Sequence, residues 1–361
     1  MIDSPVLERV LSHALRHGGE FAEVFAEDRS TSSALLDDGR VEELSSGRER
    51  GAGLRVVSGE TTGFAHTADL SEAGLLRAAE AASAVARSGG GGTRTVAVDL
   101  LDADAGAGDG SGDGRRPAGR SLGSKADTLD LLTRADDAAR STGDAISQVQ
   151  AGCGTSRRQV LIANSEGLLA RDEQARTRFT VSCVATGDTG LQTGFESAAR
   201  TLGFELFDEI SVEELAGLAA NRALSKLSAR PAPSGELPVV LAGGSGGILF
   251  HEACGHGLEA DHIVKDASVY TGRVGQQVAS PLVTLIDDGT VGSEWGTYAV
   301  DDEGRPAQRN VLIDEGVLTD YLWDYLRARK EGRVSSGNGR RQTYQHLPMV
   351  RMTNTFLLPG E

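Results

Sequence analysis

The chain has 361 residues, of which 39% are hydrophobic and 24% charged, close to the average for globular proteins. Its 47 glycines and its aromatic content of only 4% indicate many turns around a light core. The formal net charge of −16 disfavours nucleic acid as a partner, because an acidic field repels phosphate backbones. At roughly 150 residues per domain, the length predicts two domains.

The three cysteines, Cys153, Cys183 and Cys254, lie far apart without CxxC spacing. They indicate neither a disulfide framework nor a zinc knuckle, and they suit a reducing compartment. Residues 1–19 carry charges throughout and lack the continuous apolar stretch of a signal peptide. No segment approaches the roughly eighteen apolar residues of a membrane helix, so we expect a soluble, cytoplasmic protein without membrane contact.

Apolar residues recur at helical spacing over residues 4–17 and 71–87, which predicts two amphipathic helices. Between them, residues 21–66 alternate in short segments, and we expect an antiparallel meander there. Its turns are expected at three dipeptides that end in glycine, which tolerates positive φ: Asp38-Gly39, Ser46-Gly47 and Ser58-Gly59.

Residues 88–122 lose periodicity and most apolar content, so we expect a Gly-rich mobile surface insertion. A helix over 124–141, strands with a turn at 164–167, and a helix over about 211–228 follow. Helix and meander thus occur twice, which suggests related subdomains. Residues 1–230 are predicted to be an α+β domain with a helix-plus-antiparallel-meander architecture.

The stretch SARPAPSGE, residues 228–236, marks the junction to a second domain over residues 231–361. There, residues 237–242 read as a buried strand, 243–247 as a tight loop and 248–263 as a helix. The loop lacks a nucleotide-binding pattern, so close backbone packing explains its glycines better than phosphate binding does. Acid-rich turns ending in glycine predict that the rest is sheet-rich and barrel-like.

His251, Glu252 and His256 form the pattern that carries chemistry. Two imidazoles can hold Zn²⁺, which lowers the pKa of bound water to about 7, and Glu252 can act as the general base. Five residues separate the histidines, or about 140° around an ideal helix, which is too wide for one ion. The helix must therefore widen locally, as in a π-bulge, and Gly255 sits where this costs least. The alternative is a plain Glu252–His256 side-chain pair, with His251 packed or capping.

The segment HEACGHGLEAD, residues 251–261, resembles the HExxxHGxxxD motif of the TldD/PmbA metalloprotease family, with Asp261 at its final aspartate. Other segments within residues 235–361 are similar to TldD, the catalytic branch of the family, whereas the first domain agrees only in general pattern. These segments are DASVYTGRVGQQVASPLVTLIDDGT, DDEGRPAQRNVLIDEGVL and GNGRRQTYQHLPMVRMTNTFLLPG.

The resemblance implies a cytoplasmic zinc peptidase that cuts short unfolded peptides, such as a microcin precursor's leader and an antitoxin in the family. Zn²⁺ would be held by His251 and His256, with Glu252 catalytic and Asp261 orienting a ligand or capping the helix end. It also implies a related non-catalytic subunit in a heterodimer, or a homodimer, with the site inside the dimer where folded proteins cannot enter.

The resemblance further implies a third zinc ligand, a cysteine in a Gly-rich segment beyond residues 358–360. The sequence ends at Glu361, so we expect the C-terminal metallopeptidase domain to be incomplete, or another residue to replace this ligand. Four residues within the chain are candidates, although packing or surface exposure would explain each of them: Cys254, Asp261, His262 and His346.

Two other functions stay open: a non-catalytic peptide-binding or scaffolding subunit, and a metal-dependent hydrolase that acts on something other than peptides. Arg340 and Arg341 could hold a peptide carboxylate bidentately or could form a solvated turn. An extended peptide could instead add to an exposed strand edge through main-chain hydrogen bonds.

Overall fold

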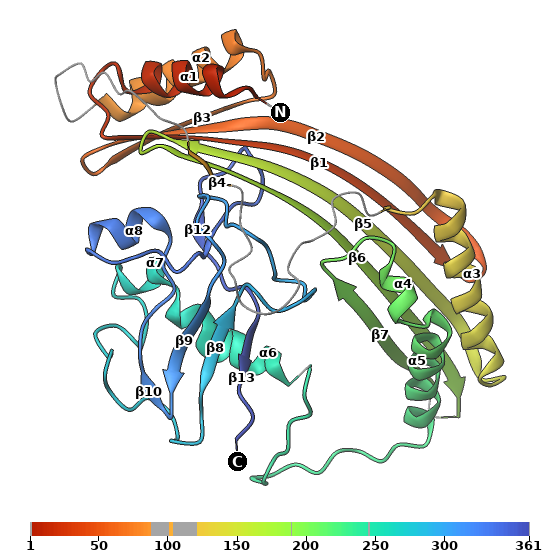
Figure 1. Cartoon of the computed structure of the whole chain (residues 1–361). Helices are drawn as coiled ribbons and strands as arrows, with labels where there is room; N and C mark the ends of the chain where they lie inside the picture. The colour runs from red at the N-terminus through yellow and green to blue at the C-terminus, as the bar shows by residue number, and fades with distance from the viewer. Residues whose placement is uncertain (1, 88–100, 104–120, 189, 245, 361) are drawn as a thin grey trace.

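A long, curved and mostly antiparallel sheet organises the molecule (Figure 1), and the predicted α+β class is confirmed. The computed structural model describes residues 2–87, 101–103, 121–188, 190–244 and 246–360. The helices before residue 230 are α1 (Ser4–Leu15), α2 (Glu72–Ala86), α3 (Lys125–Ser141), α4 (Leu206–Glu209) and α5 (Val212–Leu227). The strands of the large sheet are β1 (Phe21–Asp37), β2 (Arg40–Ser58), β3 (Thr61–Thr67), β4 (Leu101–Ala103), β5 (Ile146–Asn164), β6 (Leu168–Gly187) and β7 (Gly190–Arg200).

The four long helices begin and end within about two residues of the predicted positions. Serine side chains accept backbone N–H groups at the N-termini of α2, α3 and α5, which satisfies donors that a helix start leaves free. In α3, Ser124 and Asp127 form a reciprocal capping box. These local signals explain why helical spacing located the helices correctly.

The sheet has the order β3-β2-β1-β5-β6-β4, and β7 also pairs with β6. Pairing of β1 with β5 joins the two helix-plus-meander halves into a single sheet. The turns at Gly39 and Gly59 are confirmed, and both glycines have positive φ. The turn expected at Gly47 is wrong, because β2 runs straight through it with Gly47 paired to Thr31.

The two faces of the sheet pack against different parts of the chain. On β5, alternate residues such as Val149, Ala151 and Leu161 contact the helices, while Val160 and Ile162 contact the C-terminal part. Side chains alternate between the two faces of a strand, so all four long helices cover one face. Figure 1 shows the C-terminal part lying against the other face.

The Gly-rich insertion expected at residues 88–122 lies mostly outside the described residues. Within it, β4 pairs in parallel with Leu168–Ala170 of β6.

The C-terminal part contains short elements around a core of its own. One sheet has the order β10-β9-β8-β13, and a hairpin-like pair joins β11 to β12; closure into a barrel stays a prediction. The strands are β8 (Leu285–Asp288), β9 (Arg309–Asp314), β10 (Val317–Leu318), β11 (Gly339–Arg340), β12 (Met349–Val350) and β13 (Thr355–Leu357). The helices are α6 (Gly247–Phe250), α7 (Ala260–Ile263) and α8 (Tyr325–Lys330).

The buried strand predicted at residues 237–242 is wrong. This segment has no strand pairing, and its apolar side chains are exposed, with Val240 at 96%. A strand needs a neighbour for its backbone N–H and C=O groups, and the described residues supply none here. Apolar character alone therefore misidentified the segment.

Buried charges join the C-terminal part to the large sheet. Arg55 of β2 donates to Glu23 of β1 and to Glu303, at 2.8 Å each, while Arg341 donates to Glu23 from the other side. The Arg341 side chain is 0% exposed, so both suggestions for it, a contact with a peptide carboxylate and a solvated turn, are wrong. Arg340 lies 5.1 Å from the centre of the Tyr298 ring and is half-buried.

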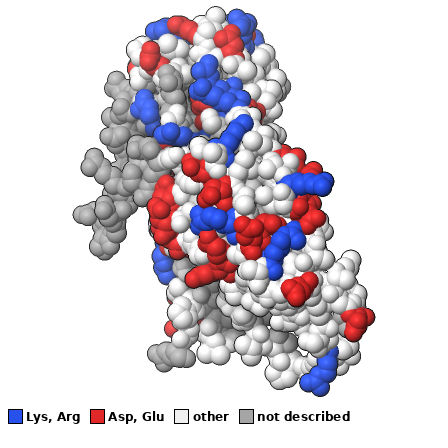
Figure 2. All heavy atoms as spheres, turned by 90° about the vertical axis from the view of Figure 1, so that its right-hand side faces the viewer, with Lys and Arg blue, Asp and Glu red and all other residues white. Residues whose placement is uncertain are grey.

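Charges of both signs lie on the face shown in Figure 2. Acidic side chains are intermixed with basic ones across its middle, in keeping with the excess of acidic residues in the sequence.

Among the helices of the described ranges, none has both the length and the apolar content to cross a membrane.

Candidate metal centre

The histidine motif lies on a helical segment that changes its winding twice. After α6, residues His251–Gly255 form a π-helix and His256–Leu258 a 3₁₀ turn, and α7 follows. The backbone N–H of His256 donates to the carbonyl of His251, five residues earlier, which is the hydrogen bond of a π-turn. The predicted local widening is confirmed. A continuous helix over 248–263 is wrong, because Glu259 is extended, with φ −77° and ψ 127°.

The π-turn brings the predicted residues together. The imidazole rings of His251 and His256 have centroids 4.8 Å apart and lie edge to face at 86°. One ligand-type atom from each of His251, Glu252 and His256 lies within 4.8 Å of the others. Glu252 is exposed, at 65% for its side chain, and its Oε2 lies 3.8 Å from His256 Nε2. The donor set of two imidazoles and one carboxylate suits zinc.

Gly255 of the π-turn packs closely against the side chain of Met352. A Cβ atom built at position 255 would lie 2.1 Å from Met352 Sδ, much closer than atoms can approach. Met352 is buried in the C-terminal core, so it has little room to move away. The glycine is therefore required by packing, because its backbone, with φ −58° and ψ −52°, is ordinary right-handed helix that any residue can adopt.

The variant Gly255→Ala is expected to destabilise the protein by about 1–3 kcal/mol, the usual cost of overpacking a core. Urea denaturation of wild type and variant would measure the difference in free energy of unfolding. The matched control is Gly247→Ala, since a Cβ at Gly247 of α6 meets nothing within 4 Å. Equal losses from both variants would rule out the Met352 contact as the cause.

Glu259 is a member of the site that the sequence analysis missed. It is fully buried, and its Oε2 lies 3.2 Å from His256 Nδ1 and 3.3 Å from Arg351 Nη1. Burial raises the pKa of Glu259, an effect opposed by its hydrogen bond to His256 and by the charge of Arg351. One sequence feature could have indicated Glu259: it is a carboxylate three residues after His256, set between the apolar Leu258 and Ala260.

Asp261 lies beside Glu259 instead of contacting the histidine pair. It is 3% exposed, its Oδ2 is 3.9 Å from Arg351 Nη1, and its Oδ1 has no hydrogen-bond partner. With Glu259 and His262 it forms a second group whose ligand-type atoms lie within 4.8 Å of one another. Arg351 already provides a cation for these two carboxylates.

No third protein ligand joins His251 and His256 within the described part of the chain apart from Glu252. Cys254 packs against the C-terminal core, where burial and the hydrogen bond that Tyr270 shares with the Cys254 sulfur raise the pKa of Tyr270 to about 12. His346 bonds Thr343 at 2.9 Å. These contacts support the packing explanation given above for Cys254 and a turn contact for His346.

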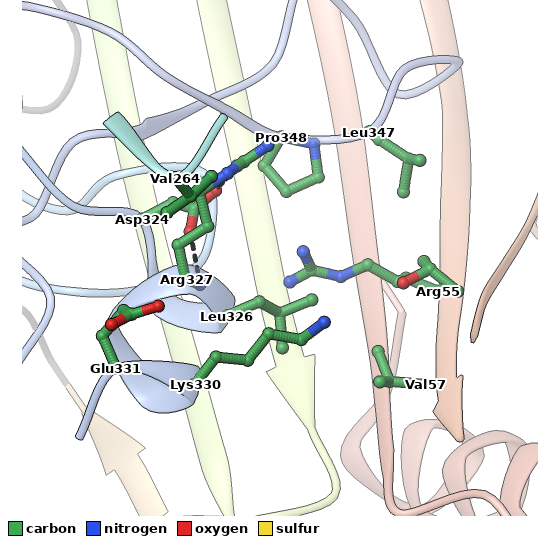
Figure 3. A pocket seen from close by; sticks show the side chains of 11 residues that line it. Arg55, Val57, Val264, Asp324, Leu326, Arg327, Lys330, Glu331, Leu347 and Pro348 are labelled. Carbon is green, nitrogen blue, oxygen red and sulfur yellow. Dashed lines mark hydrogen bonds and ion pairs between the residues drawn. The ribbon is translucent and has the colours of Figure 1, made fainter. Parts of the chain in front are cut away.

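A cavity of about 360 Å³ lies between the large sheet and α8 (Figure 3). Val57, Leu326 and Pro348 give it apolar walls, and Arg55 and Lys330 point into it from opposite sides. No motif residue lines this cavity. Three of its charged groups are paired within the protein, Arg55 with Glu23, Lys330 with Glu60 and Arg327 with Asp324. The cavity is therefore an apolar recess whose rim is largely ion-paired.

Comparison with known proteins agrees with this fold and motif. Residues 22–86, 124–227 and 234–361 match the models of PmbA/TldA metallopeptidase domain 1, the central domain and the C-terminal domain. The predicted two-domain division at about residue 230 falls between the second and third matches and stays a prediction.

Relatives in bacteria and archaea match nearly the whole chain. The metalloprotease TldD homolog of Haemophilus influenzae is 36% identical, covering 95% of this chain and 71% of that protein. A metalloprotease of Methanothermobacter thermautotrophicus is 34% identical, covering 95% of this chain and 72% of that protein. The crystal structure of TldE from Thermococcus kodakarensis has the same fold, with a TM-score of 0.77 at 20% identity over 99% of this chain and 78% of its own.

The family models and the sequence relatives together place the chain in a metallopeptidase family. The chain belongs to the PmbA/TldA metallopeptidase family, also called TldD/PmbA.

Proposed function

We propose that this chain is a zinc-dependent peptidase that hydrolyses short unfolded peptides. One observation carries the proposal: the π-turn places the His251 and His256 rings beside each other, with the exposed Glu252 carboxylate next to them. Ligands five residues apart would diverge on a regular helix, and here they converge.

The two imidazoles would hold the ion, and Glu252 would act as the base. A bound zinc ion supplies Lewis acidity and lowers the pKa of water to about 7. Glu252 would accept a proton from the attacking water and deliver it to the leaving amine nitrogen. Its exposure keeps the carboxylate available to substrate, whereas the buried Glu259 stays engaged with His256 and Arg351.

The proposal also covers a partner subunit and a cellular compartment. We extend the proposal to a paralogous, non-catalytic TldD/PmbA-family subunit, or to a second copy of the chain, as the partner in a dimer. The likeness to TldE supports a partnership within this family. The three cysteines are all free, which supports the cytoplasm as the compartment.

A second candidate function is a non-catalytic subunit that binds peptides or acts as a scaffold. It is favoured because a catalytic zinc usually has three protein ligands, and the described residues bring only two imidazoles together besides Glu252. Zinc content separates this candidate from the peptidase.

Purified protein is expected to contain about one zinc ion per chain by atomic spectrometry. His251→Ala and His256→Ala should each lose that zinc, because each removes one imidazole from a site with few ligands. His346→Ala is the matched control, since His346 bonds Thr343 away from the motif. Chelation should abolish peptide cleavage, and zinc should restore it.

Retention of zinc by both motif variants would overturn the proposed site. A chain that contains no zinc yet captures a paralogous subunit would favour the scaffold. A zinc-bearing enzyme that prefers esters or phosphates to amides in a substrate panel would contradict the peptidase.

A further inference from the structure

The two ring nitrogens of His256 face two different carboxylates. Nδ1 lies 3.2 Å from Oε2 of the buried Glu259, and Nε2 lies 3.8 Å from Oε2 of the exposed Glu252. Only the Nε2 side is therefore turned toward the group formed by His251 and Glu252. The ring has one side fixed in the protein and one side directed to the candidate metal centre.

Glu259 is itself held firmly. The backbone N–H of Met352 donates to its Oε1 at 3.3 Å, and Arg351 donates to its Oε2. Because an ionised carboxylate can only accept hydrogen bonds, its contact with His256 calls for a proton on Nδ1. The extended backbone at Glu259 ends the 3₁₀ turn and points this side chain back at the histidine.

We propose that Glu259 is a positioning residue for the metal site: it fixes the neutral His256 ring with its proton on Nδ1 and leaves the Nε2 lone pair free for zinc. The inference rests on the proposed function for the identity of the ion. A neutral imidazole carries one proton, so a carboxylate at one nitrogen decides which nitrogen can bind metal. Segment 351–352, more than ninety residues away in sequence, thereby orients a ligand.

A simpler explanation gives Glu259 only a charge-pairing role with Arg351 and His262. Asp261 provides the comparison that separates the two. It is a buried carboxylate near the same arginine, but its contacts do not include His256. A purely electrostatic role would make the two acidic residues equivalent, whereas a positioning role would not.

The first test uses the metal-free protein with ¹⁵N-labelled histidine, so it does not depend on zinc binding. Long-range ¹H–¹⁵N spectra at pH 8 report which ring nitrogen carries the proton, and His256→Gln assigns the signals. The Nδ1–H form is expected in wild type and in Asp261→Asn. Glu259→Ala should shift His256 toward the Nε2–H form. A wild-type ring protonated mainly on Nε2 would overturn the proposal.

The second test is zinc affinity by chelator competition. Glu259→Ala is expected to weaken binding about 10–100-fold, the usual effect of removing a partner that orients a metal ligand. Glu259→Gln, which keeps an acceptor of similar size, should lose less, and Asp261→Asn should stay within about twofold of wild type. Circular dichroism checks that each variant is folded, and the Gln variant serves if the Ala variant is not.

The outcomes separate this inference from the proposed function. Equal losses from the Glu259 and Asp261 variants, or unchanged affinity in folded Glu259→Ala, would reject positioning by Glu259. A wild-type chain that binds no zinc would reject the metal site itself, while the tautomer of His256 in metal-free protein would still decide whether Glu259 sets the ring.

Discussion

Glu252→Gln is expected to lower peptide turnover by about 10²–10⁴-fold, the usual contribution of a general base. Glutamine has nearly the same shape as glutamate but cannot accept the proton of the attacking water. Zinc affinity should change little, because the two imidazoles would remain as ligands. The predicted signature is therefore a folded, zinc-bearing and nearly inactive protein.

The measurement compares kcat and KM for a short fluorogenic peptide in the presence of zinc, with the chain purified alongside a co-expressed paralogous subunit. Glu60→Gln is the control for losing one exposed carboxylate, because Glu60 lies on the β2–β3 turn with its side chain 88% exposed. Turnover within twofold of wild type in Glu252→Gln would remove Glu252 from the role of base. Loss of zinc together with turnover would make it a ligand instead.

The π-turn is the part of the site that spacing alone could predict. Two metal ligands five residues apart can face the same ion only if the helix between them widens into a π-turn. The glycine at position 255 indicated where the helix could widen. Helix boundaries were predictable for a similar reason, because serine caps and helical spacing act over a few residues. Such signals are local, so they can be interpreted from the sequence without knowledge of the fold.

Features that depend on distant partners could not be predicted in the same way. Gly47 stays inside β2 because Thr31 on β1 pairs with it, and Glu259 joins the site because Met352 and Arg351 hold it. The exposed apolar segment 237–241 reads as a buried strand only if a pairing neighbour is assumed. In each case the outcome depends on whether a partner from elsewhere in the chain is present.

Arg341 shows the same dependence on a distant partner and gives the largest predicted effect on stability. Arg341→Met is expected to destabilise the protein by about 3–5 kcal/mol, the usual cost of removing one member of a buried ion pair. The guanidinium donates to Glu23 of β1 and to the carbonyl of His346, and both the Arg341 and Glu23 side chains are 0% exposed. Methionine fills similar space but removes one of the two guanidinium groups that donate to Glu23, so that Arg55 remains.

Arg340→Met is the matched control, because the neighbouring arginine is half-buried and lies over the Tyr298 ring, and its charge acts on Asp302 without a hydrogen bond to Glu23. Its expected loss is about 0.5–1 kcal/mol, that of an ordinary cation–π contact. Urea denaturation of the three proteins at one pH gives both differences in free energy of unfolding. If Arg341→Met lost no more stability than Arg340→Met, the buried pair would not hold the C-terminal part on the sheet. If instead it kept its stability but bound peptide more weakly, Arg341 would regain the role in carboxylate recognition that its burial now excludes.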